Sequence, residues 1–477
     1  MPPSRRRASD SGQWTLPAQM RRIETLLKRV VPAFTIEDVH KLRVALRRCR
    51  SLALVMEEVD PHPAWPDLRR VSRPLFRALG SLRDLQVIDA STAALTTPDD
   101  GVRAAVTGVV EQRSVEALTR VRHSAKVFDR KAWRRLARTL EPRMRVVPPN
   151  GLAAQCLVLE KFEAVSRLHL SAVETQGPME WHVLRVVLKQ FRYAVESVLP
   201  ARLSSWGQGL RHLQALLGEI HDLDVLDAFI AKEVDAVIID GVPSLRDAIR
   251  VARRAHIERY CERMAGSSSL LQVWQDGLPQ GARVRAAASA RLHATLRAAD
   301  PRADRTRRVT RLALRLFDVL VPPARAGRTQ ARCVLRAASQ LHGIRIPPRR
   351  SSRKKAAGAG VRALPAPPGW TTADWELVSL VVRYHRGSEP SLKHHRFGRL
   401  PMVDQDLVRG LVGLLRIARE LDRHGTATSA ISAERSVSGV CLRVPAMGQT
   451  PGPSVRLALA VRLLSTYLGH PLSIPNA

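Results

Sequence analysis

The sequence predicts an all-α protein built from two similar helical bundles and a further helical region. Two observations support this fold class. Apolar residues recur at helical spacing in nearly every periodic segment, as in MRRIETLLKRVVPAF, whereas alternating strand patterns are scarce. In addition, two motifs near residues 39 and 79 return about 140 residues later, which indicates a duplicated unit.

The net charge predicts an anionic partner. The chain has 477 residues, with 77 Lys and Arg against 43 Asp and Glu, a formal net charge of +34. Self-repulsion of this size destabilises a compact fold unless a partner relieves it. Nucleic acid, an anionic membrane surface and inorganic polyphosphate all carry suitable charge. Aromatic residues make up only 4% of the chain, which leaves few platforms for stacking single-stranded bases.

The cysteines and the hydropathy pattern predict a cytoplasmic protein. The five cysteines are widely spaced and form no CxxC pair, which favours reduced thiols over disulfides or a zinc site. No apolar stretch follows the basic N-terminal residues, and no run of 18 uncharged apolar residues occurs. We therefore expect neither secretion nor a membrane span.

The internal repeat defines the first domain, residues 18–280. VHKLRVALRRCRSLALVMEE near residue 39 returns as WHVLRVVLKQFRYAVESVLP near residue 181. LGSLRDLQVIDA returns as LGEIHDLDVLDA, with seven of twelve positions identical. The predicted halves are residues 18–150 and 151–280.

The remaining segments are expected to be a tail and a third helical domain. Residues 1–17 are polar and basic, as in a disordered tail. Residues 300–477 contain several amphipathic or buried helical patterns, interrupted by a basic, Pro- and Gly-rich segment at 346–370 that reads as a flexible loop.

Each repeat carries a cationic stripe along one helix. At 100° per residue, the first stripe falls within an arc of about 80°, and the second copy repeats it. The predicted stripes are His40, Arg43, Arg47 and Arg50, then His182, Arg185, Lys189 and Arg192. Apolar residues lie opposite and should enter the core: Leu42, Ala45, Leu46, Cys49 and Ala53, then Leu184, Val187, Leu188, Phe191 and Val195.

Comparing the copies favours anion binding over an ordinary solvated surface. Lys41 and Arg48, which lie off the stripe, become Val183 and Gln190, whereas every stripe position stays cationic or imidazole. Neither stripe contains an acid that would relieve repulsion. A stripe about 15 Å long suits several consecutive phosphates, and arginine and lysine would bind their oxygens.

Further groups accompany the stripes. Arg73 corresponds to Arg211, and we expect both to join the anion site. The pair Arg83-Asp84 corresponds to His221-Asp222, where a structural role and ligand contact are both open.

These motifs resemble the CHAD domain, the conserved histidine α-helical domain. The resemblance rests on the histidine-led helices, the duplicated LGxxxDLxV segments and RYAVE, over roughly residues 17–280. It implies two four-helix bundles whose basic surfaces meet around a groove, binding of inorganic polyphosphate, and association with polyphosphate granules. The triphosphate tunnel domain that often accompanies CHAD has an ExExK motif, which this sequence lacks.

The C-terminal region resembles the helical, HD-like half of the exopolyphosphatase/guanosine pentaphosphatase family, best in RYHRGSEPSLKHHRFGRL at 383–400. The metal ligands expected of an HD domain are degraded. Arg305 stands where the first histidine would align, the His-Asp pair is His342-Gly343, and Asp422 alone remains. We expect no metal, no cofactor and no catalytic residue here.

The histidines and arginine in this region suggest a second anion site. Its candidate residues are His385, Arg386, His394 and His395. A pair of surface histidines without function is the simpler interpretation.

The sequence thus favours a polyphosphate-binding protein over an enzyme. Such binding would serve granule targeting or regulation of polyphosphate metabolism, with polyphosphate-metabolising enzymes as further partners. One alternative is a phosphohydrolase of polyphosphate or phosphorylated nucleotides that uses the C-terminal region. A second is nonspecific nucleic-acid binding.

Overall fold

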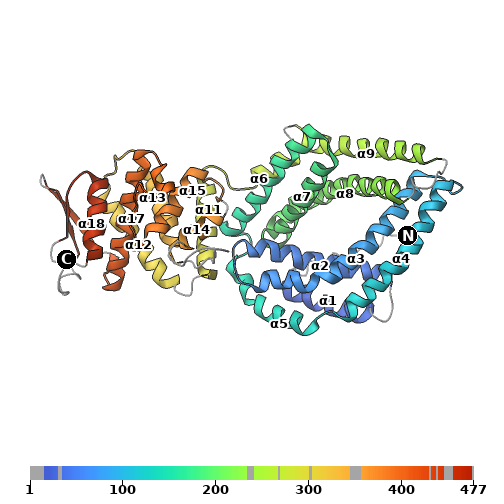
Figure 1. Ribbon diagram of the computed structural model, residues 1–477, viewed down its shortest axis with the longest axis horizontal. Coiled ribbons are helices and arrows are strands. Elements are labelled where there is room, and N and C mark those ends of the chain that lie inside the picture. Colours follow the sequence, from blue (N-terminus) through green and yellow to red (C-terminus); the bar gives the residue numbers. More distant parts are fainter. Residues whose placement is uncertain are drawn as a thin grey trace, which may run out of the picture. The chain divides into compact units, whose positions relative to one another are not determined.

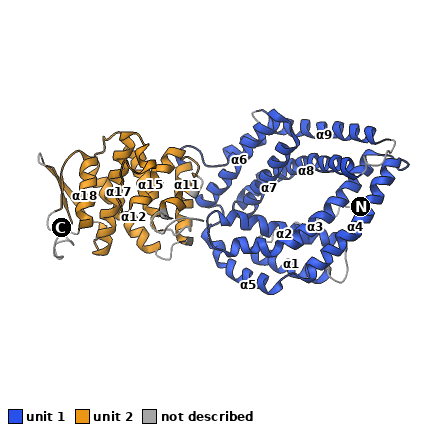
Figure 2. Ribbon diagram, in the orientation of Figure 1, with its two compact units in different colours: residues 1–283 blue, residues 284–477 orange. Residues whose placement is uncertain are grey.

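The computed structural model confirms an all-α architecture with one small sheet (Figure 1). It describes residues 15–30, 35–233, 241–266, 269–299, 303–343, 356–364, 366–428, 431–436, 439–444 and 455–474. The chain divides into two compact units, residues 1–283 and 284–477 (Figure 2). Among the described residues, none of the helices is both long and apolar enough to cross a membrane.

Unit 1 consists of two series of helices in the same order. The first series is α1 (Leu16–Val30), α2 (Ile36–Glu57), α3 (Ala64–Leu95), α4 (Gly101–Lys126), α5 (Arg130–Leu140) and the 3-10 helix η1 (Pro142–Val146). The second is α6 (Leu152–Thr175), α7 (Pro178–Val198), the 3-10 helix η2 (Pro200–Arg202), α8 (Leu203–Glu233), α9 (Val242–Met264) and α10 (Leu270–Asp276). The equivalent pairs are therefore α2 with α7 and α3 with α8.

Each series packs mainly within itself, and the two meet along the equivalent helices. Neighbours in sequence contact one another, α1 with α2, α2 with α3 and α3 with α4, then α6 with α7, α7 with α8 and α8 with α9. Across the halves, α2 packs on α7 and α3 on α8 (Figure 1). The repeat in the sequence thus becomes an approximate two-fold arrangement with the cationic helices at its junction.

Local signals set several helix ends. The side chain of Thr35 accepts a hydrogen bond from the backbone N–H of Asp38 at 3.1 Å and caps α2. Asp100 and Asp129 cap α4 and α5 in the same way. The segment RKAWRRLARTLEPRMRVV does not form one helix, because Pro142 cannot continue α5 and the chain turns into η1 instead.

A buried polar cluster fixes the first half. Asp60 is fully buried and accepts hydrogen bonds from Trp65 Nε1 at 2.8 Å and from Arg143 Nε at 2.6 Å. The second oxygen of Asp60 accepts from Arg143 Nη2 at 2.8 Å. The two-point contact neutralises the carboxylate away from water.

Unit 2 is a second helical body. Its helices are α11 (Ala282–Ala299), which begins at the unit boundary, α12 (Ala303–Leu320), α13 (Arg328–Leu341), α14 (Ala356–Ala363), α15 (Thr372–Tyr384), α16 (His395–Gly398), α17 (Met402–Arg423) and α18 (Val455–Leu468). A single apolar core contains side chains from α11, α12, α13, α15, α17 and α18. Phe317, Tyr384 and Phe397 are part of it.

A three-stranded sheet was not expected from the sequence. Its strands are β1 (Ser432–Ser436), β2 (Gly439–Arg443) and β3 (Leu472–Ser473), in the order β1-β2-β3. β1 pairs antiparallel with β2, and β3 pairs parallel with β2. The pattern VRLALAVRLLSTYLGHPL predicts one helix, but α18 ends at Leu468. Gly469 adopts φ +75°, which ends the helix, and the chain then continues into β3.

Two other sequence expectations meet the structure only in part. Of the expected tail 1–17, residues 1–14 lie outside the described residues, and α1 already begins at Leu16, which is buried. Of the expected loop 346–370, residues 346–355 and 365 lie outside them. Residues 356–363 form α14 rather than loop, because AAGAGVRA is alanine-rich and packs against α15.

Candidate anion-binding site

The stripe helices bury the faces that the sequence assigns to the core. Leu42, Leu46, Cys49, Leu184 and Phe191 are each 0% exposed. Of the ten predicted core positions, only Val187 is half-buried. The opposite faces of α2 and α7 therefore carry the cations.

The cations of the two stripes come together at the junction of the halves. Burial is the largest cause that lowers the pKa of Arg43, Arg185 and Lys189. Charges across the junction add to it: Arg47 on α2 acts on Arg185 and Lys189 of α7, and Arg185 acts on Arg43. Tyr193 of α7 lies beside the junction, since the guanidinium carbon of Arg47 is 5.9 Å from its ring centroid. We call Arg43, Arg47, Arg185 and Lys189 the junction cluster.

Several donors of the junction cluster have no partner. The Nε atoms of Arg43, Arg47 and Arg185 are buried and form no hydrogen bond. The hydroxyl of Tyr193 is also buried and also lacks a hydrogen-bond partner. A buried donor without a partner costs free energy. Three such guanidinium groups in one place are suited to a ligand that supplies several acceptor oxygens, such as a chain of phosphates.

Partial burial and mutual repulsion lower the pKa of three members of the cluster, Arg43, Arg185 and Lys189. Burial, followed by the charges of Arg185, Arg47 and Arg43, lowers the pKa of Lys189 to about 7. Burial is also the main reason why the pKa values of Arg43 and Arg185 are lowered. An anion bound at the cluster would reverse these shifts.

Two carboxylates on α3 and α8 temper the repulsion. Asp84 attracts Arg43 and Arg185, and Asp222 attracts Arg185 and Lys189. Partial burial nevertheless raises the pKa of both carboxyls, against the opposing effect of these cations. The two acids thus stabilise the charges of the cluster through space, and the structural role and the ligand contact considered for Asp84 and Asp222 both stay open.

The predicted histidines lie at the edge of the junction cluster. His182 Nδ1 is 3.3 Å from Nδ1 of His221, and their ring centroids are 4.9 Å apart. Burial, followed by Arg185 and His182, lowers the pKa of His221 to about 4, so its imidazole is neutral near pH 7. His40 is exposed, and partial burial followed by the charges of Arg83 and nearby arginines lowers its pKa.

The fourth member of each stripe contacts the next helix instead. Arg50 Nη1 donates to the backbone oxygen of Arg69 and, at 2.9 Å, to Oγ of Ser72 on α3. At the equivalent position, Arg192 Nη1 donates to Oε1 of Gln214 on α8 at 2.8 Å. Arg50 and Arg192 therefore act as clips that join α2 to α3 and α7 to α8.

The two outer arginines stay exposed. Arg73 on α3 and Arg211 on α8 lie on the solvent side of their helices. Arg73 is near Arg50, whose pKa is lowered to about 10 by burial first and then by Arg69, Arg73 and Arg77. A second basic surface thus extends along α3, away from the junction cluster.

The four candidate residues in unit 2 differ in burial and in hydrogen-bond partners. His385 is 2% exposed, its Nδ1 lies against the oxygen of Val382, and its Nε2 accepts from Arg386 Nε at 2.9 Å. His394 instead pairs with the hydroxyl of Tyr384 at 2.9 Å, and His395 is exposed at the start of α16. Both nitrogens of His385 are occupied, so it cannot take an anion as it stands.

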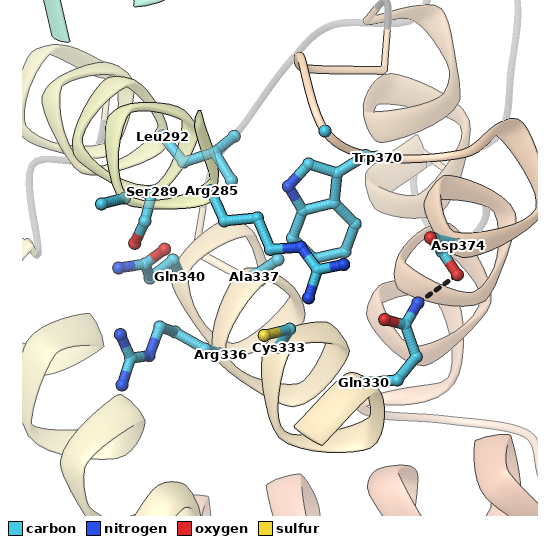
Figure 3. Close-up of a pocket in the computed structure, with 12 residues that line it drawn as sticks. Arg285, Ser289, Leu292, Gln330, Cys333, Arg336, Ala337, Gln340, Trp370 and Asp374 are labelled. Carbon is cyan, nitrogen blue, oxygen red and sulfur yellow. Dashed lines mark hydrogen bonds between the residues drawn. The ribbon is translucent and has the colours of Figure 1, made fainter. Parts of the chain in front are cut away.

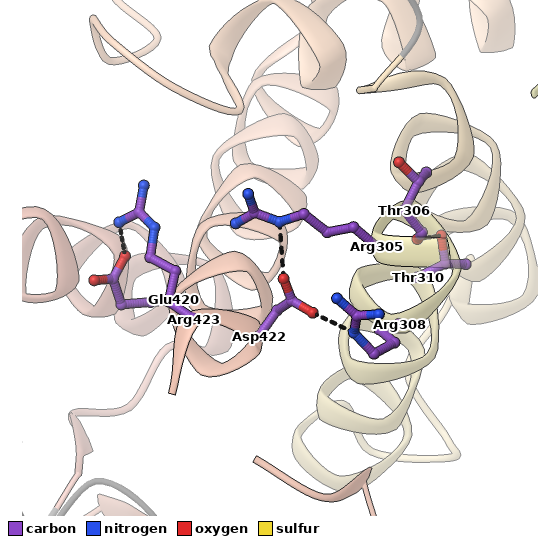
Figure 4. A network of polar contacts seen from close by, with 7 residues as sticks. All are labelled: Arg305, Thr306, Arg308, Thr310, Glu420, Asp422 and Arg423. Atoms are coloured by element: carbon purple, nitrogen blue, oxygen red, sulfur yellow. Dashed lines mark hydrogen bonds and ion pairs between the residues drawn. The ribbon is translucent and has the colours of Figure 1, made fainter. Parts of the chain in front are cut away.

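The residues around Asp422 do not fit a divalent-metal site. The carboxylate is 4% exposed, and its two oxygens accept from Arg305 Nε and Arg308 Nε at 2.9 Å each (Figure 4). Arg305 is the residue that the sequence resemblance aligns with the first histidine of an HD domain. Across the described residues, no group of three or more His, Cys, Asp or Glu could hold a metal ion.

Sequence reasoning missed the polar partners that complete these clusters. It left the role of Asp84 and Asp222 open, and it did not single out Tyr193, although RYAVE was part of the quoted motif. It also did not foresee the contact between Arg305 and Asp422, which are 117 positions apart. That contact becomes visible only in the folded structure, because nothing in the sequence relates two residues so far apart.

Comparisons with known proteins bear on unit 1. Residues 15–231 match the family model described as the CHAD domain. A matching solved structure, the crystal structure of the CHAD domain from the plant Ricinus communis, has 20% sequence identity, covers 55% of this chain and 88% of that chain, and gives a TM-score of 0.38. No curated protein matches the chain. The family match spans α1 to α7 and nearly all of α8.

Proposed function

Because residues 15–231 form a CHAD domain, we propose that this chain binds inorganic polyphosphate at the junction cluster. The observation that carries the proposal is the set of three buried guanidinium Nε–H groups without partners, on Arg43, Arg47 and Arg185. A polyphosphate chain offers phosphoryl oxygens at short, regular intervals. It can therefore satisfy donors from both halves with one flexible ligand.

The surrounding charges favour a polyanion over a single phosphate. A further basic surface, formed by Arg69, Arg73 and Arg77 around Arg50, lies on α3 beyond the junction cluster. A polymer that follows these groups would release counterions at each contact, so the affinity should fall steeply with salt. His182 and exposed His40 lie at the rim, where they can donate hydrogen bonds to the polymer when protonated.

Binding without catalysis is the simpler proposal for the whole chain. Unit 2 is proposed to be a degenerate HD-like domain. The contacts of Arg305 and Arg308 with Asp422 support this, since they fill the coordination positions of the remaining carboxylate. In this proposal the chain associates with polyphosphate granules or with enzymes that act on polyphosphate, and unit 2 contributes a regulatory or protein-binding surface.

Charge reversal at the junction cluster tests the proposal. The double variant Arg43→Glu/Arg185→Glu should lose at least about tenfold in affinity for long-chain polyphosphate. Each change replaces a cation that would donate hydrogen bonds to phosphate oxygens with an anion that repels them. Its melting temperature should stay close to that of the wild type, because the change relieves repulsion among the cations. Binding is measured by pull-down on immobilised polyphosphate across a salt series.

A matched control separates site from net charge. Arg135→Glu/Arg263→Glu changes the net charge equally, at exposed positions on α5 and α9, and should keep most of the affinity. Duplex DNA at equal phosphate concentration serves as competitor. The proposal fails if the junction variant binds like the control, or if DNA displaces polyphosphate more effectively than free polyphosphate does.

A further inference from the structure

A cavity in unit 2 lies between α11, α13 and the segment before α15. It has a volume of about 240 Å³ (Figure 3). Its walls include Leu292, Ala337 and the indole of Trp370, and the side chain of Arg285 lies beside that indole.

The volume of this cavity can be compared with that of a known ligand site. An apolar cavity of about 150 Å³ can hold benzene. This cavity therefore has room for a larger, substituted aromatic ring.

Two polar atoms at the cavity lack partners. The indole Nε1 of Trp370 and the amide Oε1 of Gln340 are buried and form no hydrogen bond. At the other end, Gln330 Nε2 donates to Asp374, so that end is already satisfied. A ring that carries both donor and acceptor groups would complement the free donor and the free acceptor.

A second, basic hollow adjoins the first. It has a volume of about 580 Å³ and shares Gln340 with the first cavity. Leu292 lines the first and Leu296, one turn further along α11, lines the second. The second hollow is lined by three arginines of α12 against one acid: Arg307, Arg308, Arg311 and Asp304.

Arginines line both hollows, Arg285 and Arg336 the first and three of α12 the second, whereas the aromatic ring of Trp370 lies only in the first. From Ala286 in the first hollow to Leu296 in the second, α11 rises by about 15 Å. Of the three arginines, Arg307 pairs with Asp304 and Arg308 with Asp422, whereas Arg311 is exposed on α12. The groove that the two hollows form therefore suits an elongated ligand with a planar aromatic head and an anionic tail.

We propose that this groove binds a nucleoside phosphate, with the base in the cavity beside Trp370 and the phosphates toward Arg311. A nucleobase is planar, can stack on an indole, and presents donors and acceptors at its edge. Glutamine amides recognise such edges in other proteins. The site is separate from the junction cluster and would make the chain responsive to a nucleotide.

The test compares nucleotides with the phosphate tail alone. Titration calorimetry on the full chain uses ADP, GDP, CDP, UDP and inorganic pyrophosphate, in the Arg43→Glu/Arg185→Glu background to remove binding at the junction cluster. At least one nucleotide should bind about tenfold tighter than pyrophosphate, because only the nucleotide gains base stacking. Its binding should also change the tryptophan fluorescence.

Variants then assign the two ends of the groove. Trp370→Ala should weaken the nucleotide about tenfold and leave pyrophosphate unchanged, and Arg311→Gln should weaken both. Arg332→Gln is the control, because Arg332 lies on α13 but pairs with Asp318 rather than lining either hollow. Gln340→Leu repeats the test of the base end, in case the loss of the Trp370 ring disturbs folding, which circular dichroism reports.

Two results would overturn the proposal. One is that no nucleotide binds more tightly than pyrophosphate in the charge-reversed background. The other is that folded Trp370→Ala and Gln340→Leu variants bind the nucleotide as the wild type does. Neither result bears on polyphosphate binding at the junction cluster, which is measured separately.

Discussion

Lys189 illustrates how a residue of the proposed binding site works against the stability of the fold. Its amine lies among three arginines, and burial together with their charges lowers its pKa from 10.5 to about 7. Between these two pH values the unfolded chain carries a proton on this lysine that the folded chain does not. Stability should therefore rise with pH across this window, since the unfolded state binds more protons there.

Replacing this lysine should reveal the effect. Lys189→Met removes the titrating group, so its melting temperature should depend less on pH between 7 and 10, and at pH 7 it should exceed that of the wild type. Thermal melts at pH 7 and pH 9.5 measure both changes. Lys232→Met, on the exposed side of α8, should keep the wild-type dependence on pH. An unchanged slope in Lys189→Met would contradict the interpretation.

The same residue should make ligand binding depend on pH. A bound phosphate favours the charged amine, so binding at pH 8 should take up protons from the buffer. This residue-level effect could not be predicted from the sequence. Its largest cause is burial, followed by the charge of Arg185 on the same helix and then by the charges of Arg47 and Arg43 on α2, in the other half of the repeat.

At the scale of elements, the cations of α2 and α7 fall into two groups: those with unpartnered donors at the proposed site, and those that contact a neighbouring helix. Arg43 and Arg47 keep unpartnered donors, whereas Arg50, one turn further, donates to Ser72 and to the backbone of Arg69. The guanidinium of Arg50 also lies 4.9 Å from the ring of Phe76. The two roles lie on one face of one helix.

Glutamine substitutions should separate these roles. Arg50→Gln should lose about 1–3 kcal/mol of stability, because the hydrogen bonds of a charged donor are removed, and should affect polyphosphate binding less than Arg43→Gln. Arg43→Gln should weaken binding while its stability is nearly unchanged. Urea denaturation and polyphosphate pull-down compare the two. The assignment of Arg50 as a clip is wrong if the order of the two stabilities is reversed.

This comparison also shows what the sequence could predict. Helical spacing placed Leu42, Leu46 and Phe191 in the core, because burial of an amphipathic helix follows its period. Spacing could not distinguish Arg50 from Arg47, because both lie on the same stripe and only the neighbour on α3 differs. The strands β1 and β2 were missed because each has only five residues: SAERS carries little alternation, and GVCLR alternates, with Val440 and Leu442 buried, over too short a stretch to stand out.

At the scale of the whole molecule, the junction cluster depends on both halves of unit 1. Arg43 and Arg47 come from the first half, and Arg185 and Lys189 from the second. The repeat in the sequence indicated two similar stripes, but their meeting at one junction follows from the packing of α2 on α7. The predicted groove between basic surfaces was implied by the family resemblance rather than by periodicity.

Salt dependence measures how many cations the polymer engages. If Arg43 and Arg185 each neutralise one phosphate, Arg43→Gln/Arg185→Gln should reduce the slope of log affinity against log salt by about 2. Arg135→Gln/Arg263→Gln should leave the slope unchanged. Fluorescence titrations from low to moderate salt measure the slopes, and equal slopes in all three proteins would exclude direct contact at the junction.

The packing of α2 on α7 brings like charges together where the two halves must hold to each other. Repulsion among these cations opposes the packing of the halves, and a polyanion lying across the junction would act as a counter-charged bridge between them. Occupancy should then make the two bundles unfold as one body at a higher temperature, with ligand concentration setting the gain. Bound polyphosphate would in this way contribute to the stability of unit 1 as a packed helix does.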